Sequence, residues 1–422
     1  MMKVIIKKFG KLSVAMNSLS VYRGLLQKTL FADYLKLAEM LCSPECDYIA
    51  LLKITSLYSE ICKILFESSF DSDLSSFVYN SILYDENKFS RECFISDNVE
   101  VNLFNAAQND YQSLMLLAGI SSEEIIDAIQ KKFPQFQELM PNFSTYKINL
   151  EMKNNPPRFE KVVNFYRKNS FGIFASHTAF VLDEKNNLNS VDIIDNIRLS
   201  DLKLYDFQKE TLIKNTLAFV QNMPCLNALL YGDRGCGKSS IVKALLNEYS
   251  SKNLRLIQIK KDNLNLLVKL FEKLAFYPLK FLLFIDDLTF NEQDKEFGEL
   301  KAALEGAICK QPKNVIIYAT SNRRHLVKET FKSREGDELH LSDTIDETLS
   351  LADRFGLVVN YNAPRKDNYL EIVRLLAKDK NLILDEDTLF KGAEAWALEK
   401  ATRSPRVASQ YIDYLLSAEI TT

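Results

Sequence analysis

The spacing of apolar residues changes along the chain, and the change predicts two kinds of structure. Up to about residue 170, apolar residues recur three and four positions apart, which is the spacing of one face of a helix. The clearest predicted helices span residues 25–41, 48–66 and 74–83. Another begins after Ser121, because Ser121 and Glu124 stand at the spacing of a capping box. We therefore predict a mainly helical N-terminal domain at residues 1–170.

The apolar stretches become shorter between residues 171 and 200. An apolar stretch at 173–182 is followed by the polar segment 183–187 and then by a second apolar stretch from Leu188. Two short apolar stretches around a polar turn predict a β-hairpin. We expect this hairpin to be a linker, or hinge, between the N-terminal domain and the rest of the chain.

From residue 226 onward, short apolar stretches alternate with helical patterns, which is typical of a parallel α/β sheet. Strands are predicted at residues 226–231, 254–259, 280–285, 315–321 and 357–361. The second of these alternates apolar and polar residues, so we predict that it lies at an edge of the sheet.

A phosphate-binding loop is predicted directly after the first of these strands. The segment GDRGCGKSS matches the pattern G-x-x-x-x-G-K-S and leads into a helix. Its glycines let the backbone approach a phosphate, and the helix N-terminus adds positive potential. Lys238 is expected to reach the β- and γ-phosphates, and Ser239 to hold Mg²⁺. The predicted nucleotide-binding residues of the loop are Gly232, Asp233, Arg234, Gly235, Cys236, Gly237, Lys238, Ser239 and Ser240.

Polar residues at the ends of two later strands complete the predicted site. Asp286 and Asp287 end the strand at 280–285, and two adjacent acids repel each other unless a cation is near. We predict that Asp286 holds Mg²⁺ and that Asp287 orients or deprotonates an attacking water. Asn322 ends the next strand and is predicted to hydrogen-bond that water or the γ-phosphate. Ligands of such sheets bind beyond the carboxyl ends of the strands, so these groups should face the loop.

Two arginines and a small apolar group are further candidates. Arg354 precedes the last strand and Arg406 opens a C-terminal helix, and a guanidinium can neutralise charge on a phosphate. The alternatives are a surface ion pair for Arg354 and a solvated helix start for Arg406. Leu204, Tyr205 and Phe207 either flank a nucleotide base or simply pack in the core.

The composition of the chain narrows the kinds of binding site and the classes of protein to be considered. The seven cysteines include only one close pair, Cys42 and Cys46, and the three histidines are scattered, so we expect reduced thiols and no Cys/His metal site. A net charge of −3 gives no overall basic signature for nucleic acid. No apolar run reaches the length of a membrane span, and the N-terminal run is too short for a signal peptide. We expect a cytoplasmic protein.

Together, the motifs between residues 200 and 416 resemble those of the AAA+ ATPases. GDRGCGKSS resembles Walker A, FLLFIDD Walker B, ATSNRR sensor 1, LADRFG the arginine-finger segment and SPR sensor 2. The nearest resemblance is to an uncharacterised bacterial AAA+ ATP-binding family, domain of unknown function 815. It implies a P-loop NTPase core at 201–362 with a five-stranded parallel sheet, in which the sensor 1 strand lies between the Walker strands. It also implies a helical lid at 363–422.

The resemblance implies a Mg²⁺-dependent ATPase that forms homo-oligomers, in which Arg354 acts on the ATP of a neighbouring subunit and Arg406 contacts nucleotide. We expect ATP turnover to remodel an unknown macromolecule held by the N-terminal domain. Many AAA+ proteins have Glu where this chain has Asp287, and the shorter side chain predicts slow hydrolysis. A slowly hydrolysing, ATP-gated switch therefore stays open as an alternative. A DNA-associated loader is a third interpretation, without a basic footprint to support it.

Overall fold

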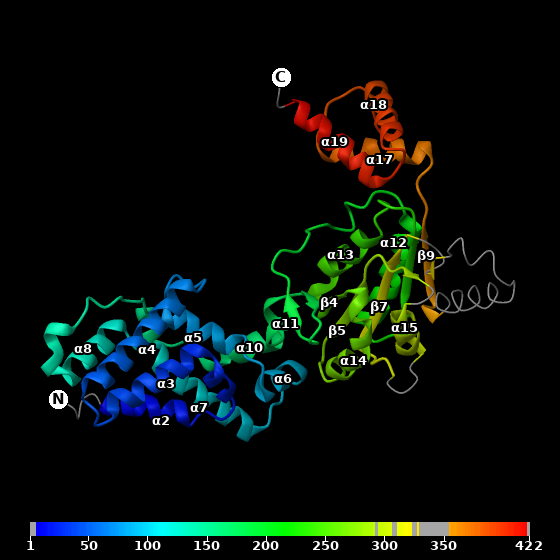
Figure 1. Ribbon diagram of the computed structural model, residues 1–422. Coiled ribbons are helices and arrows are strands. Elements are labelled where there is room, and N and C mark those ends of the chain that lie inside the picture. The colour runs from blue at the N-terminus through cyan, green and yellow to red at the C-terminus, as the bar shows by residue number, and fades with distance from the viewer. Residues whose placement is uncertain (1–5, 292–293, 306–309, 323–326, 329–353, 420–422) are drawn as a thin grey trace. The chain divides into compact units, whose positions relative to one another are not determined.

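The structure, a computed structural model, describes residues 6–291, 294–305, 310–322, 327–328 and 354–419. The chain divides into two compact units, Met1–Ser176 and His177–Thr422 (Figure 1).

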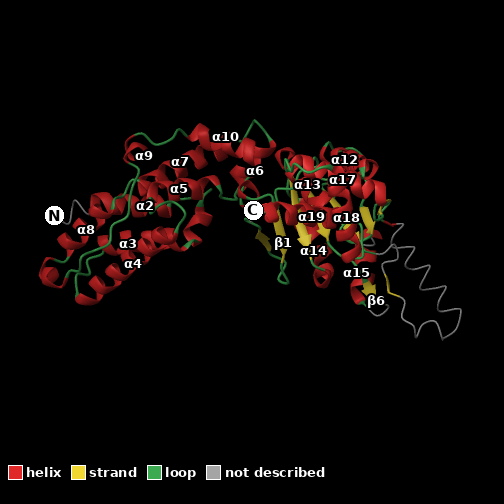
Figure 2. Ribbon diagram, turned by 90° about the horizontal axis from the view of Figure 1, so that it is seen from above, coloured by secondary structure: helices red, strands yellow, loops and turns green. Residues whose placement is uncertain are grey.

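The described part of the first unit is built from helices (Figure 2). Apolar residues at helical spacing explain them: Ile54, Ile61 and Leu65 of one long helix are fully buried, while Asp47 caps its start by accepting from Ala50 N at 2.7 Å. The elements are η1 (Ile6–Gly10), α2 (Lys11–Asn17), η2 (Arg23–Gln27), α3 (Thr29–Cys42), α4 (Tyr48–Glu67), α5 (Leu74–Leu83), α6 (Lys88–Ile95), α7 (Val101–Ala118), α8 (Ser122–Lys132), η3 (Pro134–Leu139), α9 (Leu150–Asn154), α10 (Phe159–Asn169) and α11 (Ile173–Ser176).

The capping box predicted at Ser121 is present. Glu124 N donates to Ser121 Oγ at 3.4 Å, and Ser121 N donates to Glu124 Oε2 at 3.0 Å. Helix α8 therefore begins where the sequence predicted. The predicted helices at 48–66 and 74–83 match α4 and α5, whereas residues 25–41 divide between η2 and α3.

The second unit contains the α/β sheet and its helices. Its elements are β1 (Ala179–Leu182), β2 (Leu188–Ser190), α12 (Asp206–Val220), β3 (Ala228–Gly232), α13 (Lys238–Tyr249), η4 (Ser250–Lys252), β4 (Leu254–Ile259), η5 (Lys261–Leu266), α14 (Leu267–Ala275), β5 (Lys280–Ile285), β6 (Phe290–Asn291), α15 (Lys295–Glu305), β7 (Val315–Ser321), β8 (Val327–Lys328), β9 (Leu357–Tyr361), α17 (Lys366–Asp379), α18 (Glu386–Glu399) and α19 (Pro405–Glu419).

The main sheet runs in the order β2-β1-β4-β5-β7-β3-β9. All neighbouring pairs from β1 to β9 are parallel, and only the β1–β2 pair is antiparallel. Strand β7 lies between β5 and β3, so the predicted position of the sensor 1 strand is confirmed. The carboxyl ends of β3, β5 and β7 consequently meet at one edge, where the phosphate-binding loop leaves β3.

The predicted count of five strands was wrong, because the hairpin adds two. Strand β1 pairs in parallel with β4, with Phe180 opposite Ile257, so the hairpin belongs to the sheet of the second unit. It does not form a separate linker, and residues 173–176 are helical. For the same reason β4 is not an edge strand: β1 covers it on one side and β5 on the other, and even Arg255 within it is buried.

One face of the sheet is covered by α12 and α13. Leu212 and Phe219 of α12 join Ile241 and Leu245 of α13 in one buried cluster with residues of β3, β5 and β7. These apolar faces, buried together, fix α13 against the strand that precedes it. The predicted phosphate-binding loop between β3 and α13 is thus held at both ends by the core.

Three helices follow β9 and form a small core of their own. Ile372 and Val373 of α17, Ala393 of α18 and Ala408 of α19 are fully buried in it. The segment that joins β9 to α17 contains no helix or strand. Among the described helices, none is long and apolar enough to cross a membrane.

Candidate functional site

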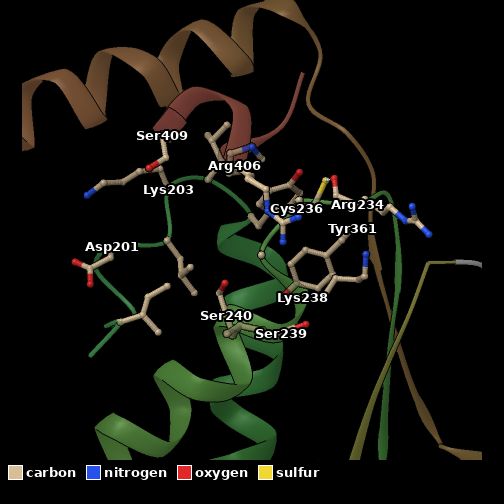
Figure 3. Close-up of a pocket in the computed structure, with 18 of the residues that line it drawn as sticks. Asp201, Lys203, Arg234, Cys236, Lys238, Ser239, Ser240, Tyr361, Arg406 and Ser409 are labelled. Atoms are coloured by element: carbon tan, nitrogen blue, oxygen red, sulfur yellow. Dashed lines mark hydrogen bonds between the residues drawn. The ribbon is translucent and has the colours of Figure 1, made fainter. Parts of the chain in front are cut away.

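A cavity of about 710 Å³ opens at the carboxyl ends of β3, β5 and β7 (Figure 3). Its volume suits a nucleotide-sized ligand. Most of the predicted site residues line it: Arg234, Gly235, Cys236, Gly237, Lys238, Ser239, Ser240, Asp286, Asp287, Asn322 and Arg406. Gly232, Asp233 and Arg354 are not among the lining residues.

The backbone of the loop requires glycine at two close approaches. At Gly232, φ is +134° and a Cβ would lie 2.2 Å from Tyr361 O, so a side chain cannot fit there. At Gly235, φ is +76° and a Cβ would lie 2.8 Å from Ser404 Oγ. Gly237 is the N-cap of α13, so the loop ends at a helix N-terminus of the kind that binds anions.

Lys238 is the buried cation of the site. Only 7% of it is exposed, and its Nζ donates to Gly232 O at 2.8 Å, Asp233 O at 2.7 Å and Asn322 Oδ1 at 3.1 Å. Burial lowers the pKa of its ammonium group, and nearby acids oppose that shift. The lysine is thus held at the mouth of the loop by three oxygens that carry no full charge.

Asp286 accepts hydrogen bonds from two hydroxyl groups. Its Oδ1 accepts from Ser239 Oγ at 2.6 Å and from Thr320 Oγ1 at 2.5 Å. The sequence analysis missed Thr320, although a hydroxyl side chain inside the buried strand β7 was a signal for it. A carboxylate beside hydroxyl oxygens is the kind of donor set that Mg²⁺ prefers, so Asp286 and Ser239 fit the predicted metal role.

Asp287 is connected to the lysine through Asn322. Asn322 Nδ2 donates to Asp287 Oδ1 at 2.5 Å, while Lys238 Nζ donates to Asn322 Oδ1. Asp287 has a left-handed backbone with φ +52°, and its N–H donates to Thr320 Oγ1 at 2.9 Å. The two strand-end groups that the sequence singled out are therefore in direct contact beside the phosphate-binding loop.

The opposite wall of the cavity comes from a segment whose role the sequence left open. Leu204 and Tyr205 line the cavity, together with Leu202, which the sequence analysis did not name. Tyr205 OH donates to Asn362 O at 2.7 Å, and its ring lies 5.2 Å from that of Tyr361. Phe207 is 79% exposed and does not line the cavity, so the prediction that it packs in the core was wrong.

The two predicted arginines lie at different ends of the sheet. Arg406 lines the cavity from the start of α19, and its backbone N–H donates to Gly235 O at 3.3 Å. Arg354 is exposed at the amino end of β9 and lines a second cavity of about 530 Å³ with Asn227 and Lys313. The length of β9, about 13 Å, separates it from the first cavity.

No curated protein matches this chain. Solved structures similar to it include a RuvB mutant from Thermotoga maritima, with 16% identity and a TM-score of 0.35, over 51% of this chain and 64% of that one. Another is the FIGL-1 AAA domain in complex with ADP, with 18% identity and a TM-score of 0.33, over 47% and 67%. A family model described as a protein of unknown function, DUF815, matches residues 175–419, and the chain therefore belongs to the DUF815 family.

Proposed function

We propose that this protein is a Mg²⁺-dependent ATPase whose turnover remodels a macromolecular partner held by the N-terminal unit. The observation that carries the proposal is the contact of Lys238, Asn322 and Asp287 beside the hydrogen-bonded pair of Ser239 and Asp286. A phosphate on this loop would meet a buried ammonium group and a helix N-terminus on one side and two carboxylates on the other.

Each group then has a role that follows from its chemistry. Lys238 would donate to the oxygens of a phosphate seated on the loop. Ser239 and Asp286 would hold Mg²⁺, which would neutralise phosphate charge when bound, together with the phosphate oxygens. Asp287 would accept the proton of the attacking water, and Asn322 holds its carboxylate in place. Arg406 reaches the cavity from α19 and is suited to contact the phosphates.

Arg354 would act on a neighbouring subunit. Its position at the amino end of β9 leaves it too far from the cavity of its own chain. In a ring or other homo-oligomer, the same side chain could meet the γ-phosphate bound to the next subunit and stabilise the charge of the transition state. The proposal therefore requires assembly for activity.

The test is ATP hydrolysis per subunit as the protein concentration is raised, with Arg354→Ala alongside. A rate that climbs with concentration and is lost in the variant, while ATP binding remains, supports a site shared between subunits. Lys243→Ala is a suitable control, since its partly exposed side chain pairs with Asp195 on the surface. A rate that is independent of concentration and unchanged in Arg354→Ala would exclude the role of the arginine.

One observation favours a second candidate, an ATP-gated switch that hydrolyses slowly. Asp287 is one methylene shorter than the glutamate of many AAA+ proteins, and its Oδ1 is already bound by Asn322. A carboxylate that is short and held in this way reaches an attacking water poorly. Tight ATP binding with near-zero turnover at every protein concentration would favour the switch. DNA loading finds no support in the net charge of −3.

A further inference from the structure

The phosphate-binding loop is attached to the point at which the chain leaves the sheet. Asp233 N donates to Tyr361 O at 2.9 Å, and Asp233 Oδ2 accepts from Ala363 N at 2.7 Å. Gly232 approaches Tyr361 so closely that a Cβ would overlap its carbonyl group. Asp233 thus turns its carboxylate away from the cavity and toward the segment 362–365.

That segment is the only connection in sequence between the sheet and the last three helices. Residues 362–365 contain no helix or strand, and α17 begins at Lys366. Because these helices pack mainly on one another, a change in the backbone at 362–365 would move them together relative to the sheet. A hydrogen bond to Ala363 N therefore acts at a hinge.

The same residue also contacts the lysine that would meet the phosphate. Lys238 Nζ donates to Asp233 O at 2.7 Å, so one residue bonds to Lys238 by its carbonyl group and to Ala363 by its carboxylate. A phosphate seated on the loop would draw Lys238 from the Asp233 carbonyl and would itself fix the backbone of the loop. An Asp233 fixed in this way would hold Ala363 N more firmly through its carboxylate.

Two other contacts come from the segment before α12 and not from the loop. Tyr205 OH donates to Asn362 O at the hinge, and Lys203 forms an ion pair at 2.5 Å with Asp379, the last residue of α17. Neither contact involves the loop, so both would be kept whether or not a phosphate is bound. At α19, Arg406 N donates to Gly235 O, which is a second contact between loop and helices. The carboxylate of Asp233 is the loop side chain that bonds to the hinge backbone.

We propose that Asp233 is a positioning residue that transmits phosphate binding at the loop to the orientation of the last three helices through its hydrogen bond with Ala363. This inference rests on the proposed nucleotide site. It assigns no contact with the ligand to Asp233, in contrast to the sequence analysis, which counted Asp233 among the nucleotide-binding residues.

The test compares wild type with Asp233→Ala in the full-length protein. In wild type, ADP should protect the amides of Asn362, Ala363 and Arg365 from hydrogen exchange, since Pro364 between them has no N–H. In Asp233→Ala that protection should be lost, and a fluorescent ADP analogue should dissociate about ten-fold faster, a typical size for coupling between sites. Inorganic tripolyphosphate should still bind to Asp233→Ala, because the loop that would hold the phosphates is kept, and its affinity should fall by no more than the same factor of about ten.

Two further variants make the result specific. Asp233→Asn keeps an oxygen that can accept from Ala363 N and should retain most of the protection, which also separates the effect from a failure to fold. Asp385→Ala removes a comparable bond, from Thr388 N to Asp385 Oδ1 at 2.9 Å, at the start of α18, and should leave ADP dissociation unchanged.

The outcomes separate this inference from the proposed function. If wild type binds neither ADP nor tripolyphosphate, the nucleotide site itself is wrong and the inference fails with it. If wild type binds both and Asp233→Ala keeps the ADP-induced protection at 362–365 and the dissociation rate of wild type, the site stands and the positioning role of Asp233 is excluded.

Discussion

The two units of this protein differ in where their charged side chains gather. In the first unit, Asp110 accepts from the N–H groups of Ser20, Val21 and Tyr22 at 2.7–3.0 Å, and Lys132 donates to Ser43 O at 2.5 Å. Both side chains form these hydrogen bonds with the backbone of their own unit. In the second unit, the buried Lys238 and the exposed acids Asp286 and Asp287 line one cavity together.

The difference explains why only one unit shows its chemistry in the sequence. A ligand site on a parallel sheet requires polar residues at strand ends and glycines in one loop, and these stand out against apolar strands. A buried polar residue that supports a helical unit looks like any other polar residue in the sequence. Four predictions test this comparison, from the largest expected effect to the smallest.

The strongest test removes the cation of the cavity. Lys238→Ala should weaken ATP binding by at least about 100-fold, because the charged hydrogen bonds to the phosphates are lost. Titration calorimetry measures the affinity, with Lys243→Ala as the control from the same helix. Binding as tight as that of wild type would show that the cavity is not the nucleotide site.

The second test concerns the acid beside Asn322. Asp287→Asn should lower kcat for ATP hydrolysis by about 100-fold, because an amide cannot accept the proton of the attacking water. The affinity for ATP should change little, since Asp287 contacts Asn322 and not the loop. Steady-state kinetics on the assembled protein measures both. If kcat survives, the proton acceptor is another group.

The third test concerns Asp110, a buried acid of the first unit. Asp110→Ala should lower its free energy of unfolding by about 2–3 kcal/mol, since three N–H groups lose a charged acceptor. Circular dichroism follows the helices of both units during denaturation, while the fluorescence of Trp396, the single tryptophan, reports on α18. Only the first signal should shift, and ADP affinity should stay the same. Asp127→Ala, which removes a surface pair with Lys131, is the matched control.

An equal shift of the Trp396 transition in Asp110→Ala would contradict the comparison. It would mean that the two units unfold together, and that a residue of the first unit supports the cavity in the second.

The smallest expected effect comes from a strained residue at the end of α10. Ser170 has φ +74° and ψ −156°, a conformation that favours glycine, and its buried hydroxyl has no partner among the described residues. Ser170→Gly should therefore stabilise the first unit by about 1 kcal/mol. Ser113→Gly, inside α7, should instead destabilise it by about 0.5 kcal/mol. Thermal denaturation measures both, and a destabilised Ser170→Gly would show that the strain is offset by contacts of the serine.

The sequence by itself was sufficient for the features that depend on local geometry. The loop from Gly232 to Ser240 is set by glycines and a following helix, and the acids Asp286 and Asp287 simply end an apolar strand. The capping box at Ser121 needs only residues three positions apart. Such features are formed by residues that are close together in the sequence, so the residue types at those positions are enough to predict them.

Features that depend on distant partners were decided only by the tertiary structure. Whether β4 lies at an edge depends on β1, which pairs with it from some 75 residues earlier in the sequence. The roles of Thr320 and Asp233 depend on Asp286 and Ala363, which other elements bring to them. A residue type shows which bonds a side chain can form, but which partner it meets is fixed by the pairing of strands and the packing of helices far apart in the chain.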